Sequence, residues 1–316
     1  MTSVAVVGTD HAHVVELTQR LVAAGASVAA VVATDDGIGP WLASQYPDAR
    51  ADEPFGADVD IVITAAVPSD RAQIAIDAMH AGKDVVLDKP GVTTHEQLAR
   101  VRAAQAETGR RWLVVFNERL GNPAMVEALR LVGDGAIGDV VHTVGLGPHT
   151  LNARHRPDWF FDPARYGGIL VDIGSHQVDQ FLTFSGATDA TVLAATVRAD
   201  PRHAGLQVFG EMLLRGDNGL TGYARLDYFT PKGLGSWGDV RLTVVGTAGF
   251  LEVRAAEEQL VLVDGESRRE IDCTGRPVHW AEVFVRGAMP VAQRHVFAVH
   301  DVCLRAQGTS TTLPTA

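Results

Sequence analysis

The chain has 316 residues, 46% of them hydrophobic and 21% charged, which is typical of a globular protein and long enough for two domains. Acidic residues outnumber Lys and Arg by 38 to 27, and the formal charge of -11 excludes nucleic acid as an expected partner. Two distant cysteines and the lack of a long apolar run predict a cytoplasmic protein without a disulfide or zinc framework and without a membrane partner.

The first 120 residues alternate short apolar runs with helical patterns, which is typical of a parallel βαβ sheet. Helices that end at Gly25, Gly82 and Gly109 separate the runs. The expected strands are rich in Val, Ile and Ala, as strands covered on both faces require. They are Val4–Val7, Ser27–Val32, Ile61–Ala65, Asp84–Leu87 and Trp112–Phe116. We therefore predict an α/β domain of the Rossmann type, a doubly wound parallel sheet, over residues 1–120.

After Phe116 the pattern changes to strands joined by short turns. Three helices are expected, near Pro123–Val132, Ser175–Ser185 and Val291–Ala306. This pattern predicts an α+β domain over residues 121–316, built on a mostly antiparallel open sheet, with the boundary near 118–122. An open sheet face favours a homo-oligomer, a dimer or a tetramer. The expected strands are Asp139–Leu146, Ala190–Val197, Val208–Leu214, Leu220–Tyr228, Asp239–Val245, Gly249–Val253 and Leu260–Val263.

The turn after the first strand is where a Rossmann domain binds the pyrophosphate of a dinucleotide. Residues 8–13 read Gly-Thr-Asp-His-Ala-His, so only the first glycine of the GxGxxG motif is present. Asp10 and His13 take the places of the other two. The backbone amides of Thr9, Asp10 and His11 could still bind phosphate, with Asp10 capping the helix. The alternative is an ordinary α/β turn without a nucleotide.

The second strand leads to Asp35, close to where an acidic residue binds the ribose hydroxyls of NAD. No Lys or Arg lies nearby for the 2′-phosphate of NADP, so the sequence favours NAD and leaves NADP open. An Asp in this position is also common as a surface turn residue.

Two later segments carry a family resemblance. Residues 82–90 end in Leu87-Asp88-Lys89-Pro90, and residues 167–179 carry Asp172 with His176 four positions on. The first segment is similar to a signature strand that ends in Glu-Lys-Pro, and the second to an Asp/His segment of a second domain. Further matches follow in the same order, at Phe116-Asn117-Glu118-Arg119, Pro123, Gly135-Ala136-Ile137-Gly138, Trp159 and Gly246-Thr247-Ala248-Gly249. Over residues 4 to about 253 the chain thus resembles the Gfo/Idh/MocA family of NAD(P)-dependent oxidoreductases. It departs from the family at Arg71, where a His is usual.

The resemblance implies hydride transfer between a nicotinamide cofactor and a hydroxyl or carbonyl carbon of a sugar, a polyol or a related small molecule. Lys89 follows a parallel strand and would stabilise the substrate oxygen, while Asp172 and His176 can share one helix face. His176 would then be the base and Asp172 its orienter or a substrate ligand. His155 and Arg156, in the loop 147–166, are further candidate substrate contacts. The expected cofactor contacts are Gly8, Thr9, Asp10, His11, Asp35, Ala66, Val67, Asp88, Lys89 and Asn117.

Two other functions are weighed against this one. His11 and His13 resemble the HxH metal pair of amidohydrolase barrels, which would make the chain a metal-dependent hydrolase. Such a barrel needs eight βα units, and the β-rich second half does not supply them, so no metal is expected. The fold could also serve a non-catalytic, nucleotide-sensing or partner-binding protein, against which Lys89, Asp172 and His176 argue. The sequence leaves the substrate and the direction of the reaction open.

Overall fold

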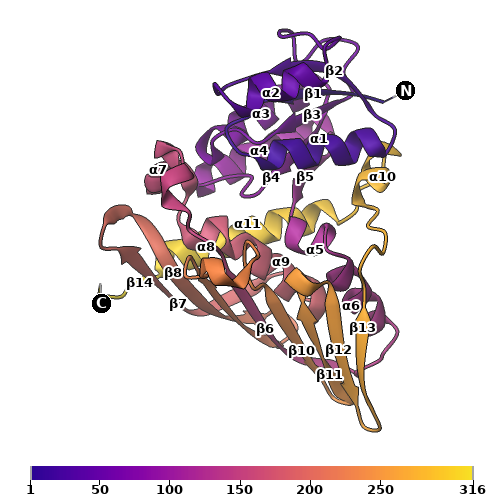
Figure 1. Cartoon of the computed structure of the whole chain (residues 1–316), viewed down its shortest axis with the longest axis vertical. Coiled ribbons are helices and arrows are strands. Elements are labelled where there is room, and N and C mark those ends of the chain that lie inside the picture. The colour runs from indigo at the N-terminus through magenta and orange to yellow at the C-terminus, as the bar shows by residue number, and fades with distance from the viewer. Residues whose placement is uncertain (1, 315–316) are drawn as a thin grey trace. The chain divides into compact units, whose positions relative to one another are not determined.

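Five parallel strands in the order β2-β1-β3-β4-β5 form the sheet of the first unit of the computed structural model, which describes residues 2–314 (Figure 1). The strands are β1 (Ser3–Val7), β2 (Ser27–Val32), β3 (Ile61–Thr64), β4 (Asp84–Asp88) and β5 (Trp112–Val115). Their side chains are almost entirely buried in β3, β4 and β5, which is why these segments carry no alternating pattern. The five predicted strands are confirmed to within one residue at each end.

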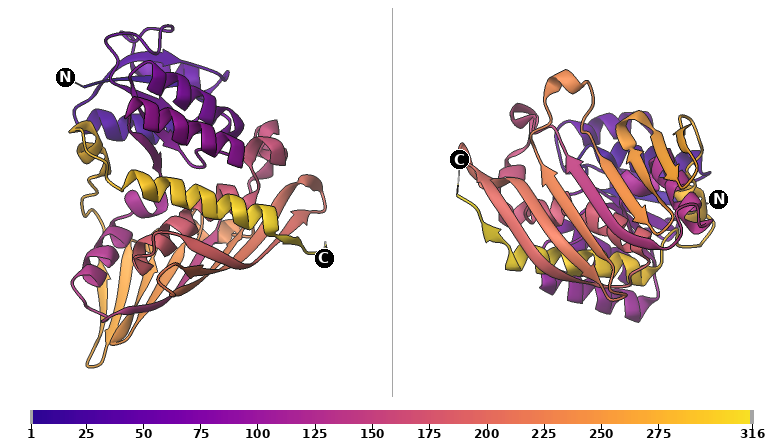
Figure 2. Two further views of the ribbon diagram at one scale, coloured as in Figure 1. Left: turned by 180° about the vertical axis from the view of Figure 1, so that it is seen from behind. Right: turned by 90° about the horizontal axis from the view of Figure 1, so that it is seen from below.

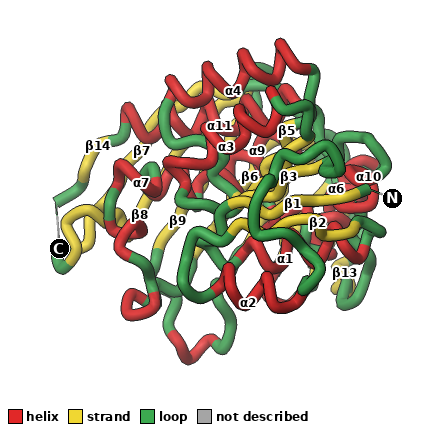
Figure 3. The backbone as a smooth tube through the Cα atoms, turned by 90° about the horizontal axis from the view of Figure 1, so that it is seen from above, coloured by secondary structure: helices red, strands yellow, loops and turns green. Residues whose placement is uncertain are grey.

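Helices cover both faces of this sheet (Figure 3), with α1 and α2 on one side and α3 and α4 on the other. The doubly wound α/β prediction is therefore confirmed. The α4 helix begins at Thr94, whose hydroxyl accepts a hydrogen bond from the Gln97 amide (3.1 Å), and Gly109 ends it in the left-handed conformation. The helices of this unit are α1 (His13–Ala23), α2 (Ile38–Gln45), α3 (Pro68–His80), α4 (His95–Thr108) and α10 (Trp280–Val285).

The first unit runs to Val115 and also takes in two later segments, Ala164–Gly167 and His279–Phe297. The second segment packs against the first unit through the edge strand β5. The side chain of Gln293 accepts a hydrogen bond from the Trp112 amide (3.0 Å) and donates one to the Trp112 carbonyl (2.9 Å). These are the bonds that the backbone of a neighbouring strand would make to this edge. The predicted single boundary near residue 120 does not include these two segments. They could not be predicted, because nothing local in the sequence marks them.

A nine-stranded sheet in the order β13-β12-β11-β10-β6-β9-β8-β7-β14 forms the second unit. Only the β6–β9 and β7–β14 pairs are parallel, which confirms the mostly antiparallel prediction. The short strands β13 and β14 were not predicted. The strands are β6 (Val140–Pro148), β7 (Ala190–Asp200), β8 (His203–Gly216), β9 (Thr221–Asp227), β10 (Arg241–Gly246), β11 (Gly249–Arg254), β12 (Gln259–Asp264), β13 (Arg268–Asp272) and β14 (Thr311–Thr312).

Helices pack on one face of the second sheet, with α9 against β6 and α6 against β11. Gly145 and Gly147 point to that face of β6, where a Cβ atom would meet the Gln177 side chain at 2.4 and 2.9 Å. The helices are α5 (Asn117–Leu120), α6 (Pro123–Gly133), α8 (Ile169–Asp172) and α9 (Gly174–Ser185), while α7 (Pro163–Tyr166) and α11 (Gln293–Thr309) are divided between the units.

Figure 2, right, looks onto the opposite face of the nine-stranded sheet, which no helix of the described residues covers. In the same part of the chain no helix is both long and apolar enough to cross a membrane.

Candidate functional site

The turn after β1 depends on Gly8. Its φ is +83°, and a Cβ atom there would lie 2.5 Å from the Cβ of Ala66, so only glycine lets the turn lie against the end of β3. The Gly8 amide donates to the Val32 carbonyl (3.2 Å), and the Gly8 carbonyl accepts from the Ala65 amide (3.1 Å). Gly8 thus links the carboxyl ends of three strands, as a dinucleotide cradle requires.

Two backbone amides that were expected to bind phosphate already have partners. The Thr9 amide donates to the Thr34 hydroxyl (2.9 Å), and the His11 amide donates to the Ala65 carbonyl (3.0 Å). Asp10 accepts from the Thr34 hydroxyl (2.5 Å), and α1 begins without a capping side chain. The expectation that Asp10 caps the helix is therefore wrong, because Thr34 holds its carboxylate.

Asp35 caps the start of α2. Its carboxylate accepts hydrogen bonds from the amides of Gly37, Ile38 and Gly39 at 2.7, 2.5 and 2.9 Å, and from the Thr9 hydroxyl. Partial burial disfavours the ionised carboxylate, but these hydrogen bonds outweigh it and lower the pKa of Asp35. A ribose hydroxyl would have to share the carboxylate with these donors.

Asp88, at the end of β4, is the centre of a buried cluster of charged and polar side chains. Its Oδ1 lies 2.9 Å from His13 Nδ1, and its Oδ2 lies 3.2 Å from His11 Nδ1 and 3.1 Å from Arg71 Nη2. Burial opposes ionisation, yet the charges of His13 and Arg71 and the imidazole hydrogen bonds hold the pKa of Asp88 well below its ordinary value.

Arg71 also fixes the backbone around Lys89. Its Nη1 donates to the carbonyl oxygens of Asp88, Lys89 and Pro90 at 3.0, 2.6 and 3.0 Å, and its Nε donates to Ala66 (2.7 Å). Only 1% of the surface of Arg71 and 8% of that of Lys89 are exposed. The Lys89–Pro90 peptide is cis. Lys89 therefore sits at the carboxyl end of β4 on a backbone that one guanidinium holds in place.

Asp172 and His176 lie at a junction between two helices of the second unit. Asp172 ends α8, α9 begins at Gly174, and the His176 amide donates to the Ile173 carbonyl (3.0 Å). The Asp172 carboxylate accepts a hydrogen bond from the Tyr228 hydroxyl (3.1 Å), and His176 is only 3% exposed. The two residues thus lie on either side of the junction, four positions apart.

Side chains of α5 form hydrogen bonds with side chains of α9. Arg119 makes two hydrogen bonds to Asp179, at 2.6 and 2.7 Å, and both side chains are buried. The Glu118 carboxylate accepts hydrogen bonds from the side-chain amides of Gln177 (2.9 Å) and Gln180 (3.0 Å). Every residue of α9 except Thr183 is buried, so these polar contacts replace water for a helix that carries the candidate base.

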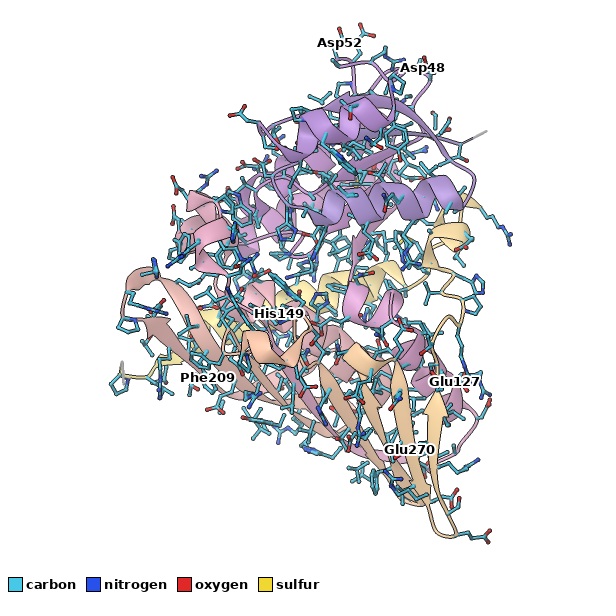
Figure 4. All side chains as sticks on the ribbon, viewed as in Figure 1. Asp48, Asp52, Glu127, His149, Phe209 and Glu270 are labelled. Atoms are coloured by element: carbon cyan, nitrogen blue, oxygen red, sulfur yellow. The ribbon has the colours of Figure 1, made fainter. Side chains whose placement is uncertain are left out.

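The predicted substrate contacts lie in a loop with aromatic neighbours. The Arg156 guanidinium is 4.2 Å from the ring centre of Phe160 and 4.9 Å from that of Trp237. The His149 ring, labelled in Figure 4, lies edge-to-face with Trp237 at 6.5 Å. His155 is exposed at the end of a 3-10 turn (Ala153–His155).

The predicted site residues divide between the two units. The first unit holds the turn residues, Ala66, Val67, Asp88 and Lys89, and the second holds Asn117, His155, Arg156, Asp172 and His176. Val67 directly precedes α3, and Asn117 opens α5 with its side chain against Gly121.

Comparison with known proteins decides the family. Residues 3–116 match a profile described as "Oxidoreductase family, NAD-binding Rossmann fold", and residues 125–252 match the "GFO/IDH/MocA C-terminal domain". A crystal structure assigned to an oxidoreductase from Erwinia carotovora atroseptica superposes with a TM-score of 0.95 at 37% identity, over 99% of this chain and 100% of that chain. The chain belongs to the Gfo/Idh/MocA family of oxidoreductases. Its first unit is accordingly an NAD(P)-binding Rossmann domain, and the predictions of an enzyme and of a nicotinamide cofactor are confirmed.

Two further proteins are similar to the chain at lower identity. Inositol 2-dehydrogenase 2 of Saccharopolyspora erythraea is 27% identical over 97% of this chain and 92% of its own length. The structure of levoglucosan dehydrogenase in complex with NADH has a TM-score of 0.80 at 18% identity, over 97% of both chains, so that likeness concerns the fold alone.

The family assignment settles the alternatives raised by the sequence. The hydrolase barrel is wrong, because five strands form an open sheet whose carboxyl ends bring His11 and His13 to Asp88 rather than to a ring of eight strands. The non-catalytic interpretation finds no support among relatives that are named dehydrogenases.

Sequence reasoning missed the roles of Arg71, Tyr228, Glu118 and Arg119. Arg71 had a signal, because it stands where the family usually has a His, and Glu118 and Arg119 fall within a matched motif. Tyr228 ends the predicted strand Leu220–Tyr228, and nothing local indicates that its hydroxyl reaches Asp172, 56 residues earlier.

Proposed function

We propose that the chain is an NAD-linked dehydrogenase that transfers a hydride between the cofactor and a CH–OH carbon of a sugar, a polyol or a related small molecule. The observation that carries the proposal is the α8–α9 junction, where Tyr228 holds the Asp172 carboxylate one turn from the buried His176 imidazole. A carboxylate that is held in place can orient an imidazole or a substrate hydroxyl, and an imidazole can accept a proton near neutral pH.

The Gly8 turn has the backbone shape that a dinucleotide needs, but the backbone amides that would bind its phosphates differ from the family pattern. Gly8 lets the turn lie against Ala66 at the end of β3, whereas the Thr9 and His11 amides are already paired. Gly8, Ala66 and Val67 would hold the dinucleotide, together with Thr9, Asp10, His11, Asp35, Asp88, Lys89 and Asn117. When bound, the nicotinamide accepts or supplies the hydride.

The chain's own groups manage the proton and the charge on oxygen. His176 takes the proton of the substrate hydroxyl, Asp172 orients His176 or the substrate, and the Lys89 ammonium donates a hydrogen bond to the oxygen. Arg71 keeps Lys89 in place through the Lys89 carbonyl.

The names of relatives and the aromatic loop support the substrate class. Relatives are named for inositol and for D-xylose, the latter 30% identical over 37% of this chain. Trp237 is 51% exposed beside Arg156, and a flat ring of this kind packs on the C–H face of a cyclic polyol. His155 and Arg156 would then contact the hydroxyl groups.

Titration of the protein with NADH and NADPH, followed by a turnover screen of cyclitols and aldoses with NAD⁺, tests the proposal. We expect NADH to bind more tightly than NADPH, and at least one polyol to reduce NAD⁺. Gly8→Ala should abolish NADH binding. Gly25→Ala is the matched control, because its φ of +99° is similarly strained but its Cβ would meet nothing within 4 Å. A wild-type protein that binds neither nucleotide would refute the assignment.

We also propose that the chain forms a homo-oligomer through the uncovered sheet face. Val141, Leu193, Leu213 and Phe250 remain 37–46% exposed on strands of this sheet, and a second copy of the chain would cover apolar side chains of this kind. Sedimentation equilibrium should give the mass of a dimer or a tetramer, and Leu213→Glu should shift it toward the monomer. A monomeric wild-type protein at about 50 μM would contradict this proposal.

A further inference from the structure

The turn after β1 presents imidazole rings where a Rossmann motif has glycines. The amides of Thr9 and His11 donate to the Thr34 hydroxyl and the Ala65 carbonyl, so two of the three backbone donors expected for phosphate are occupied. The rings of His11 and His13 lie edge-to-face with 4.2 Å between their centres, and both turn Nδ1 toward Asp88. Two imidazole side chains thus add to the polar surface of a turn in which two backbone donors are occupied.

The two histidines differ in exposure. The His11 side chain keeps 21% of its surface and that of His13 keeps 44%. Burial, and then the neighbouring His13, lower the pKa of His11 to about 4, so His11 is neutral at neutral pH. His13 is thus the member of the pair that is open to a ligand and free of this burial.

The groups around His13 suit an anion. His13 donates from Nδ1 to Asp88, whose other oxygen is paired with the buried Arg71, and this leaves the Nε2 edge as the outward nitrogen. Asp10 is the opposing negative charge, and the Thr34 hydroxyl holds its carboxylate. A protonated His13, Asp88 and Arg71 together carry one net positive charge, which a phosphate group would balance.

We propose that His13 binds a phosphate of the dinucleotide through Nε2, in place of the glycine-rich turn. The inference rests on the proposed function, since it assumes that NAD or NADP binds over the Gly8 turn. The ring must carry both protons to donate to Asp88 and to phosphate at once.

The variant His13→Gly separates the two possibilities, because it restores the third glycine of GxGxxG and they predict opposite changes in affinity. If His13 is a phosphate ligand, His13→Gly should weaken the binding of NADH and of ADP-ribose by about tenfold or more, and leave adenosine unchanged. If the turn still binds phosphate in the usual way, removal of the side chain should leave the affinity equal or raise it, and that result would overturn the inference. His80→Gln, at a half-exposed histidine that pairs with Glu107 at the far end of α3, is the matched control.

Calorimetry supplies a second readout that does not depend on activity. Titrations with NADH should give a less favourable binding enthalpy for His13→Gln than for the wild-type protein, because the phosphate loses a hydrogen bond from the imidazole. Equal binding enthalpies in both proteins would contradict the role of His13. A wild-type protein that binds no NADH would instead refute the proposed function, so the two failures can be told apart. Thermal unfolding of each variant checks that the turn still folds.

Discussion

Replacement of Lys89 by Met is expected to lower kcat by about 100- to 10,000-fold, with NADH affinity within a few-fold of the wild-type value. The ammonium group is the proposed donor to the substrate oxygen, and in that role it would stabilise a charge that develops only during the reaction. The backbone should keep its shape, because Arg71 binds the carbonyl of residue 89 and not its side chain. Stopped-flow measurement of NADH formation and a separate NADH titration distinguish the two effects.

The control for this prediction is Lys83, at the other end of the same strand. Its Nζ donates to the carbonyls of Gly56 and Val59, each at 2.7 Å, so its role is structural. Lys83→Met should lower the melting temperature by leaving two carbonyls without this donor, and leave kcat of the folded protein unchanged. A Lys89→Met enzyme with wild-type kcat, or a Lys83→Met enzyme that loses turnover without loss of stability, would argue against the assignment.

The elements that the sequence predicts well are those whose signal is local. The strands of the first unit are apolar runs separated by helices that end at glycines, and the structure keeps the bounds of the strands to within one residue. The α2 helix was not predicted, because Gly37 and Gly39 read as a turn. Its start is stabilised by Asp35, whose carboxylate collects three amides from that same segment. The same Asp was predicted as a ribose ligand, because an Asp that follows the second strand can either bind a ribose or cap the next helix.

The polar clusters of the site could not be predicted, because their members are far apart in the sequence. Asp88 and His13 are separated by 75 residues, and Glu118 and Gln180 by 62. The sequence did mark His13, as a residue in place of a glycine. It gave no sign that the imidazole pairs with Asp88, since that contact follows from the order of strands in the sheet. Local patterns thus place the site residues on elements, and the topology decides which of them meet.

The second large effect concerns the ion pair between Arg119 and Asp179. Asp179 is fully buried and Arg119 is 5% exposed, and two hydrogen bonds join them. Arg119→Met should therefore lower the free energy of unfolding of the second unit by about 3–5 kcal/mol, because it leaves a carboxylate in the core without its guanidinium. Denaturant unfolding followed by circular dichroism measures the loss.

A double variant shows whether the cost comes from the unpaired charge. Arg119→Met combined with Asp179→Leu should recover a large part of the stability, since no charge is then buried. The exposed pair Arg268–Glu270 is the matched control, and Arg268→Met should change the free energy of unfolding by less than about 0.5 kcal/mol. If the double variant were no more stable than Arg119→Met, packing and not charge would hold α9. Because α9 carries His176, recovered stability without recovered turnover would mean that the ion pair also sets the position of the base.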